Sequence, residues 1–247
     1  MDLSLIIPAY NEADRIGASL EKTLEWAAAQ SFAVEVLVVD DGSRDNTVEV
    51  ASRYAGEGIR VLAQPRNMGK GAAVRRGMLE AKGAYRIFTD ADFSTPITEA
   101  TRVLAELANC DVVIGSRAID SSFIKEHQPW YRESMGKAFN LLVQLLAVPG
   151  IHDTQCGFKG FRARAAQELF SRTKIDGFGF DVEVLYLARR LSFGIKEIPV
   201  EWYNDPRSTL NPVADSLKML GELLRVRRLH RDLDTTSHVG AAIEGQG

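Results

Sequence analysis

The chain has 247 residues, of which 45% are hydrophobic and 26% charged, and its formal net charge is -3. This composition is ordinary for a globular protein with a substantial core, and the slight negative charge argues against a protein whose main task is to bind nucleic acid. The two cysteines, Cys110 and Cys156, lack the spacing of zinc ligands, so we expect no zinc site and no disulfide framework, as suits a reducing compartment.

The N-terminal residues enter an apolar segment at once, without the basic region and cleavage site of a secretion signal. We therefore expect a cytoplasmic protein. The longest apolar stretch, AFNLLVQLLAVP at 138–149, is shorter than the roughly 20 residues that a spanning helix needs. It predicts a helix that does not cross a bilayer, although it could lie on one.

Apolar, β-branched segments alternate with helical patterns over residues 1–118. The predicted strands lie in LSLIIPAY (3–10), VEVLVVDDGS (34–43), IRVLAQ (59–64), AYRIFTDAD (84–92) and DVVIGSR (111–117). The predicted helices between them lie in 13–30, 46–55, 69–83 and 97–108. This order, with nearly continuous apolar strands, predicts an α/β fold: an open, mostly parallel, twisted sheet with helices on both faces.

The pattern is less regular after Arg117. A polar stretch leads into an apolar helix near 136–150, and the loop GIHDTQCGFKGF (150–161) follows. Further helices, a strand in IKEIPVEW (195–202) and a helix from Val213 to about Leu233 complete this half. We interpret residues 1–235 as one domain, with a regular α/β half at 1–118 and a less regular half with amphipathic helices at 119–235, before a flexible tail at 236–247.

Polar residues follow four of the predicted parallel strands. They are PAYNE after the first, DDGS after the second, DAD after the fourth and GSR after the fifth. Ligands of open α/β sheets bind outside the carboxyl ends of the strands, which share one edge. The alternative is a set of independent turns rich in turn-forming residues. The shared edge favours a binding site.

Asp90 and Asp92 are the most informative pair in this set. Two neighbouring carboxylates repel each other unless a cation lies between them, and oxygen ligands suit Mg²⁺ or Mn²⁺. Because Mg²⁺ usually takes one or two carboxylates together with substrate phosphates, the pair predicts a site for a metal-bound diphosphate. A helix start at Thr95 and Pro96 is the simpler explanation of the acids that precede them. Asp40 or Asp41 could accept a hydrogen bond from a base or a ribose.

Motifs in a fixed order along the chain carry a family resemblance. IIPAYNE, VVDDGSRDNT, NMGKGAAVRRGM and DAD resemble the family 2 glycosyltransferases, which use nucleotide-sugars and have the GT-A fold. DTQCGFKGF, the segment GFGFDVEVLYLARRLSFGIKEIPVEW and PRS are similar to the subgroup of dolichyl-phosphate glucosyltransferases and dolichyl-phosphate mannose synthases, with the glucosyl branch the better match. The resemblance covers residues 3–210 and implies a nucleotide-sugar half at 1–118 and an acceptor-side half at 119–235.

The resemblance implies roles for individual residues. It implies a nucleotide site lined by Pro8, Ala9, Tyr10, Glu12 and Asp41, with Lys70 nearby, and a metal site at Asp90 and Asp92, with Asp92 as the direct ligand. It implies phosphate contacts for Arg117, with Arg132 and Arg207 as further candidates. Phe93 and Ser94 stand where the mannosyl branch usually has leucine and glutamine, which puts a third metal ligand in doubt.

The resemblance also implies an inverting transfer from a nucleotide-sugar, UDP-glucose above all, to a polyprenyl phosphate. Such a phosphate is already anionic at neutral pH and needs no strong base, so Asp181 and Glu183 are candidates for orienting the sugar or holding a loop, with Asp181 as catalytic base the alternative. Gln155 and Lys159 lie in a loop that either contacts substrate or is structural.

A lipid acceptor requires contact with a membrane. The helix near 136–150 has more apolar residues than one buried stripe needs, and the helix from Val213 combines leucines with Lys218 and four arginines. We expect peripheral membrane contact from these helices, although both could instead pack on the body. The oligomeric state is not predicted.

Other functions remain open on the sequence. A mannosyl or other hexosyl donor such as GDP-mannose, or a soluble acceptor, would use the same fold. A nucleotidyltransferase would share the metal and diphosphate site, but it wants a glycine-rich basic loop after the first strand, where this chain has PAYNEADRIG. A non-catalytic sensor of nucleotide-sugars is disfavoured by the intact Asp90, Asp92 and Arg117.

Overall fold

The computed structural model describes residues 1–56, 58–126, 128–205 and 212–233, apart from the side chains of 130–132 and 212–217. The strands are β1 Leu3–Ala9, β2 Val34–Asp40, β3 Ile59–Ala63, β4 Tyr85–Thr89, β5 Val112–Ser116, β6 Phe158–Arg162 and β7 Ile195–Pro199. The α-helices are α1 Ala13–Ala28, α2 Thr47–Ser52, α3 Lys70–Glu80, α4 Glu99–Leu107, α5 Trp130–Leu146, α6 Ala163–Phe170, α7 Phe180–Arg190 and α8 Pro212–Leu229.

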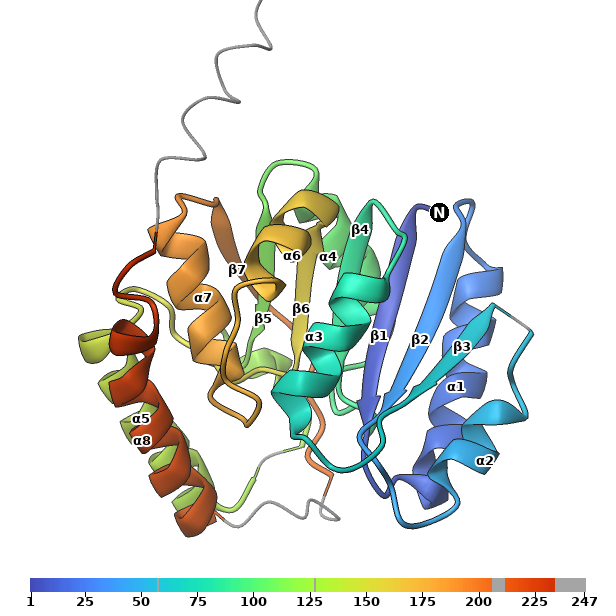
Figure 1. The fold of residues 1–247 in the computed structure, drawn as a ribbon, viewed down its shortest axis with the longest axis horizontal. Coiled ribbons are helices and arrows are strands. Elements are labelled where there is room, and N and C mark those ends of the chain that lie inside the picture. Colours follow the sequence, from blue (N-terminus) through green and yellow to red (C-terminus); the bar gives the residue numbers. More distant parts are fainter. Residues whose placement is uncertain (57, 127, 206–211, 234–247) are drawn as a thin grey trace, which may run out of the picture.

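All seven strands form one sheet in the order β3-β2-β1-β4-β6-β5-β7 (Figure 1). β1 is parallel to β2 and β4, β2 to β3, and β5 to β7, whereas β6 is antiparallel to both β4 and β5. The predicted open, mostly parallel α/β sheet is therefore confirmed.

Strand β6 was not predicted, because we expected a loop over 150–161. Phe158 and Phe161 are fully buried on opposite faces of the sheet, but Lys159 and Gly160 between them interrupt the apolar pattern. Gly160 is needed here, since a Cβ would overlap Val103 of α4. Because β6 lies between β4 and β5, residues from both sides of position 118 share one sheet.

The core lies on both faces of the sheet. On β1, Ile6 packs in the cluster that contains α3, α6 and α7, while Leu5 and Ile7 pack in the cluster that contains α1 and α4. Alternate residues of a strand point to opposite faces, so a continuous apolar strand is what two covering layers require. Figure 1 shows these two helix layers with the sheet between them.

Two helix boundaries differ from the prediction. Helix α4 begins at Glu99 after Thr98, so Thr95 and Pro96 lie in the preceding turn and do not begin the helix. Helix α5 begins at Trp130, earlier than the apolar run alone indicated. In Figure 1, α5 and α8 lie side by side at the end of the molecule farthest from β3. No helix in the described part of the chain is long and apolar enough to cross a membrane.

Candidate active site

Strands β1, β2, β4 and β5 all end at one edge of the sheet. They run in the same direction, since β1 is parallel to β2 and β4, and since β4 and β5 are both antiparallel to β6. Tyr10, Asp41, Asp90 and Arg117 follow these strand ends. The structure thus brings together the four loops that the sequence singled out, and we call this region the strand-end edge.

A tight turn after β4 presents Asp90 and Asp92. The N–H of Phe93 donates to the carbonyl of Asp90 at 3.1 Å, and the N–H of Ser94 donates to Asp92 Oδ1 at 3.0 Å. Phe93 has a φ of 50°, in the left-handed region that bulky residues rarely adopt. The turn fixes where the two carboxylates stand.

Gly157 gives Asp90 its space. The Asp90 N–H donates to the Gly157 carbonyl at 3.2 Å, because β6 begins directly beside the end of β4. A Cβ at position 157 would overlap the Asp90 carboxylate. Sequence reasoning missed Gly157, since nothing local to DTQCG indicates that the segment meets a carboxylate from residue 90.

Burial raises the pKa of Asp92, and the nearby charge of Asp90 raises it further, against the opposing effects of the Ser94 N–H, Arg15 and Lys70. Two carboxylates in this situation gain from a shared cation. Carboxylate oxygens are ligands that suit Mg²⁺ or Mn²⁺, and the missing side chain at Gly157 lets the Asp90 carboxylate take its place in the pair. In the part of the chain that the structure describes, no group of three or more His, Cys, Asp or Glu side chains is placed to hold a metal ion.

Lys70 binds the carboxylate of Asp90. It is the first residue of α3, and its Nζ lies 2.5 Å from Asp90 Oδ1. The preceding Gly69 has a φ of 106°, and a Cβ there would overlap the carbonyl of Asp176. This close approach explains the glycine before the lysine in NMGKG.

Asp40 and Asp41 differ in what their carboxylates already bind. Asp41 is 3% exposed, and its oxygens accept hydrogen bonds from Gln64 Nε2, Met68 N and Gly69 N, each at 2.8 Å. Asp40 Oδ2 accepts the N–H groups of Gly42 and Ser43 at 3.0 and 3.1 Å. Asp40 Oδ1 is buried and finds no hydrogen-bond partner among the described residues. Of the two, only Asp40 has an oxygen without a hydrogen-bond partner among the described residues, and that oxygen is shielded from solvent.

Arg117 is paired with Asp153, a residue that sequence reasoning did not select. Its Nε and Nη2 donate to the carboxylate at 2.7 and 2.8 Å, its N–H donates at 3.0 Å, and its guanidinium lies over the Trp202 ring. Burial alone would raise the pKa of Asp153, but Arg117 outweighs burial and holds it below its ordinary value. The pair leaves Nη1 on the side of the guanidinium away from Asp153.

Asp181 lies beneath the strand-end edge. Its carboxylate binds the ammonium of Lys159, which is 0% exposed, also donates to the Cys156 carbonyl at 2.6 Å and lies over the Phe88 ring. Burial raises the pKa of Asp181, against the lowering effects of Lys159 and Lys70. Lys159 therefore belongs to β6 and to the interior, where we had placed it in a loop.

Glu183 holds a loop. It is fully buried, accepts the N–H groups of Lys174 and Ile175 at 2.9 Å each, and lies 2.6 Å from His230 Nε2. Of the two roles that the sequence left open for Glu183, these contacts favour the structural one.

The remaining predicted site residues lie around β1. Pro8 and Ala9 are buried within the strand, and Tyr10 is exposed beyond its end. Glu12 binds Arg15, whose guanidinium also reaches Asp205 at 3.0 Å; the Glu12 bond is the main reason that the pKa of Arg15 lies above its ordinary value. Arg207 and the side chain of Arg132 lie outside the described residues.

Comparison with known proteins identifies the family. The model of the family described as glycosyl transferase family 2 matches residues 4–170. The chain belongs to glycosyltransferase family 2. The predictions of a glycosyltransferase and of its family are thereby confirmed.

Several curated relatives of this family 2 protein share one name, dolichyl-phosphate beta-glucosyltransferase. The chain is 38% identical to the Drosophila melanogaster protein over 92% of its own length and 74% of the relative's. It is 36% identical to the Dictyostelium discoideum protein over 91% and 73%, and 34% identical to the human protein over 91% and 74%. The resemblance to this subgroup is confirmed.

Solved structures of other glycosyltransferases share the fold. Mannosyl-3-phosphoglycerate synthase from Rubrobacter xylanophilus gives a TM-score of 0.72 at 19% identity, over 97% of this chain and 78% of that one. Glucosyl-3-phosphoglycerate synthase from Mycobacterium tuberculosis, in complex with Mn²⁺, UDP-glucose and phosphoglyceric acid, gives 0.69 at 18% identity, over 91% and 79%. These likenesses confirm the GT-A fold.

Proposed function

We propose that this protein transfers glucose from UDP-glucose to a polyprenyl phosphate such as dolichyl phosphate, with inversion at the anomeric carbon. The observation that carries the proposal is the meeting of Asp90, Asp92 and Lys70 at the carboxyl ends of parallel strands, a site suited to a metal-bound diphosphate. The names of the relatives supply the sugar and the acceptor.

The donor nucleotide lies, in this proposal, over the ends of β1 and β2. The exposed Tyr10 ring covers the base, and Asp40, buried at the end of β2, holds the turn at Gly42 and Ser43 beside it. Asp41, with both oxygens engaged, holds the loop that carries Lys70. Pro8 and Ala9 shape the site through the backbone of β1, and Glu12 shapes it by holding Arg15.

Asp92 and Asp90 would hold Mg²⁺ or Mn²⁺. A divalent ion there supplies positive charge where negative charge builds on the departing diphosphate. The M. tuberculosis fold relative has been solved with Mn²⁺ or Mg²⁺ together with UDP, which supports either ion. The protein's own share is to keep the two carboxylates in place through the Phe93 turn and the space beside Gly157.

A phosphate acceptor needs its attacking oxygen to be positioned, and it does not need a base to remove a proton from that oxygen. A phosphate monoester has a second pKa near about 6, so its attacking oxygen is already anionic at neutral pH. Arg117, kept in place by Asp153 and Trp202, offers Nη1 to a phosphate oxygen. Asp181 binds Lys159 in the interior and so helps to fix β6 beneath the site. Arg207 is a further candidate for a phosphate contact.

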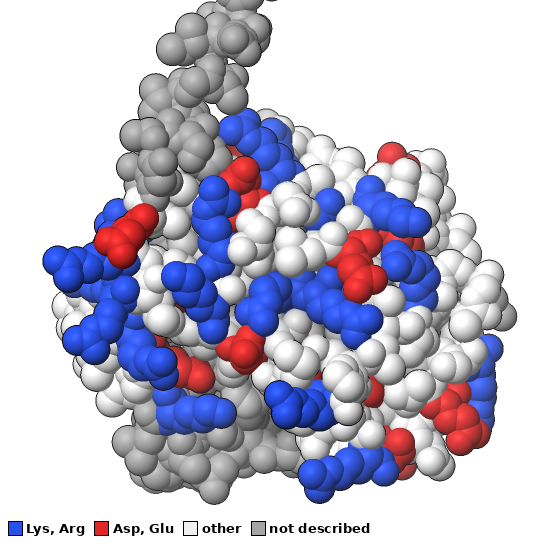
Figure 2. Space-filling model, in the orientation of Figure 1, with Lys and Arg blue, Asp and Glu red and all other residues white. Residues whose placement is uncertain are grey.

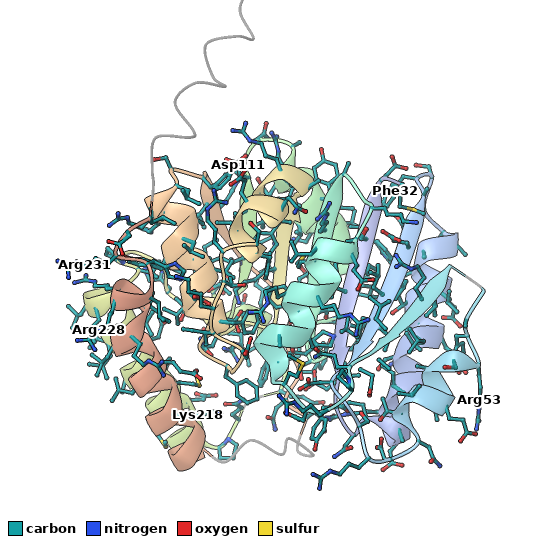
Figure 3. All side chains as sticks on the ribbon, viewed as in Figure 1. Phe32, Arg53, Asp111, Lys218, Arg228 and Arg231 are labelled. Atoms are coloured by element: carbon teal, nitrogen blue, oxygen red, sulfur yellow. The ribbon has the colours of Figure 1, made fainter. Side chains whose placement is uncertain are left out.

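The α5/α8 pair is the proposed membrane contact. Leu141, Leu142 and Leu145 of α5 and Leu224 of α8 are exposed, with Leu145 at 71% and Leu224 at 63%. Figure 2 shows Lys and Arg side chains along α8. In Figure 3, Arg228 and Arg231 lie at the outer side of this helix pair, whereas Lys218 lines a pocket between α8 and the loops at 67–69 and 174–177. Apolar side chains flanked by cations suit the surface of an anionic bilayer, so we place the protein at the cytoplasmic face of a membrane.

A transfer assay tests the function directly. Purified protein receives UDP-glucose, UDP-N-acetylglucosamine or GDP-mannose, with Mg²⁺ or Mn²⁺, and either dolichyl phosphate in vesicles or a water-soluble phosphate monoester. We expect glucosyl dolichyl phosphate with a β linkage, and only background turnover with Asp92→Asn. Preference for GDP-mannose would replace the proposed donor, and equal use of the soluble acceptor would remove the lipid from the proposal.

A further inference from the structure

Lys70 differs from the other cations at the strand-end edge. Near this edge, Arg15 binds Glu12 and Asp205, Arg117 binds Asp153, and Lys159 binds Asp181. Lys70 instead binds Asp90, one of the two carboxylates suited to a metal ion, at 2.5 Å. Its ammonium therefore uses an oxygen that a divalent ion would need.

The backbone of Lys70 is held firmly, so that only its side chain can change partner. Asp41 accepts the N–H groups of Met68 and Gly69, and the carbonyl of Asp176 accepts the N–H of Ala72 at 3.2 Å. The Lys70 side chain is only partly buried, and a lysine side chain turns easily about its four-carbon stem. Its reach thus covers a neighbouring phosphate as well as Asp90.

The surroundings keep Lys70 charged. A lysine amine is protonated at neutral pH, and the Asp90 carboxylate lies 2.5 Å from this ammonium. A divalent ion bound to Asp90 would lie beside the Lys70 ammonium, and the positive charges of the ion and the ammonium would repel each other. A diphosphate relieves the repulsion, because it gives the ammonium oxygens of its own.

We propose that Lys70 couples metal binding to donor binding: its ammonium competes with the divalent ion for Asp90 and moves to the diphosphate of the nucleotide when both bind together. The inference rests on the proposed function, whose donor and metal it uses. Coupling of this kind is reciprocal, so the metal raises the affinity for the nucleotide as much as the nucleotide raises the affinity for the metal. No covalent bond is made or broken; the Lys70 ammonium only exchanges one ionic partner for another.

The test measures binding, without transfer or acceptor. Lys70→Met keeps the length of the side chain and removes the charge. Titration calorimetry and the electron paramagnetic resonance of free Mn²⁺ give the affinity for Mn²⁺ alone and for UDP at saturating Mn²⁺. Relative to the unchanged protein, we expect Lys70→Met to bind Mn²⁺ alone about fivefold to tenfold more tightly and to bind UDP about tenfold more weakly.

The opposite signs distinguish the exchange from a structural role, which would weaken both affinities. Lys70→Gln repeats the test should the methionine variant fold poorly, and Lys22→Met, an exposed lysine on α1, carries the same change of net charge away from the edge. Unchanged or weaker Mn²⁺ binding by both Lys70 variants, or unchanged UDP binding, overturns the inference. If the unchanged protein binds neither Mn²⁺ nor UDP, the proposed function itself fails.

Discussion

The strand-end edge and the α5/α8 pair differ in whether their unusual side chains have partners within the protein. The edge has charged groups near the interior, and the helix pair has apolar groups at the surface. At the edge, charged groups bind one another across large sequence distances, as Arg117 does with Asp153 and Lys159 with Asp181. On the α5/α8 pair, apolar side chains such as Leu145 are left uncovered. Geometry at the edge is set by contacts within the protein, whereas the helix pair exposes apolar side chains that we propose contact a membrane. Substitutions in the first region should therefore change chemistry or folding, and those in the second should change only location.

The largest effect is expected from Asp92→Asn. The amide keeps the shape of the side chain but removes the charge that a divalent ion needs, so transfer should fall by at least about a hundredfold, while the unfolding temperature stays close to that of the unchanged protein. Glucosyl transfer and thermal unfolding, measured on the same preparation, check both halves. Near-normal transfer would remove Asp92 from the metal site.

Asp153→Asn should be the strongest test of folding stability at the edge. It leaves Arg117 without its carboxylate, and breaking such a pair costs about 3 kcal/mol in the free energy of unfolding at pH 7. The matched control is Glu49→Gln, which breaks the exposed pair with Arg53 and should cost less than about 0.5 kcal/mol. Urea unfolding measures both.

The Asp153 effect should also depend on pH. The pKa of Asp153 is lower in the folded protein than its ordinary value near about 4, so its contribution is fully present above that value and is lost as the pH falls through the lower, folded pKa. The stability difference between the unchanged protein and Asp153→Asn should therefore be constant between about pH 5 and about pH 7 and shrink below about pH 4. A difference that grows on acidification contradicts the pairing.

On the helix pair, Leu142→Ser with Leu145→Ser should weaken binding to anionic vesicles by about tenfold, because less apolar surface leaves water. The rate of UDP-glucose hydrolysis or of transfer to a water-soluble acceptor should not change. The unfolding temperature should not change either. The same positions changed to methionine remain apolar and serve as the control. Equal vesicle binding by the serine and methionine variants would favour another partner for this surface.

Gly157→Ala should have the smallest effect, and a confined one. The new Cβ overlaps the Asp90 carboxylate, whose flexible end can move aside, so stability should change by less than about 1 kcal/mol while the affinity for Mn²⁺ falls by about tenfold. Gly136→Ala, on α5, meets no atom within 4 Å and should leave Mn²⁺ binding unchanged. Equal Mn²⁺ affinity in the two variants would show that Asp90 does not depend on the space beside Gly157.

Much of the edge was predictable from local patterns. Apolar runs followed by helical periodicity gave β1 to β5 and the helices between them, and the acids after β4 indicated a site for a cation and a diphosphate. Strand β6 was not predictable in this way, because Lys159 and Gly160 stand at its centre. Lys159 is buried only because Asp181 and the Cys156 carbonyl receive its ammonium, and Asp181 lies 22 positions away.

The sequence by itself determined β1 to β5 with the helices between them, the edge at which the polar loops meet and the kind of chemistry that paired carboxylates allow. Side-chain periodicity is local, and a helix between two strands makes those strands parallel. Only the tertiary structure decided that Asp40 has an oxygen without a partner among the described residues while Asp41 is engaged, that Arg117 is held by Asp153, and that Lys70 rests on Asp90. These outcomes depend on which groups meet after folding, and a buried charge or hydrogen-bonding group takes whatever partner the fold brings within reach.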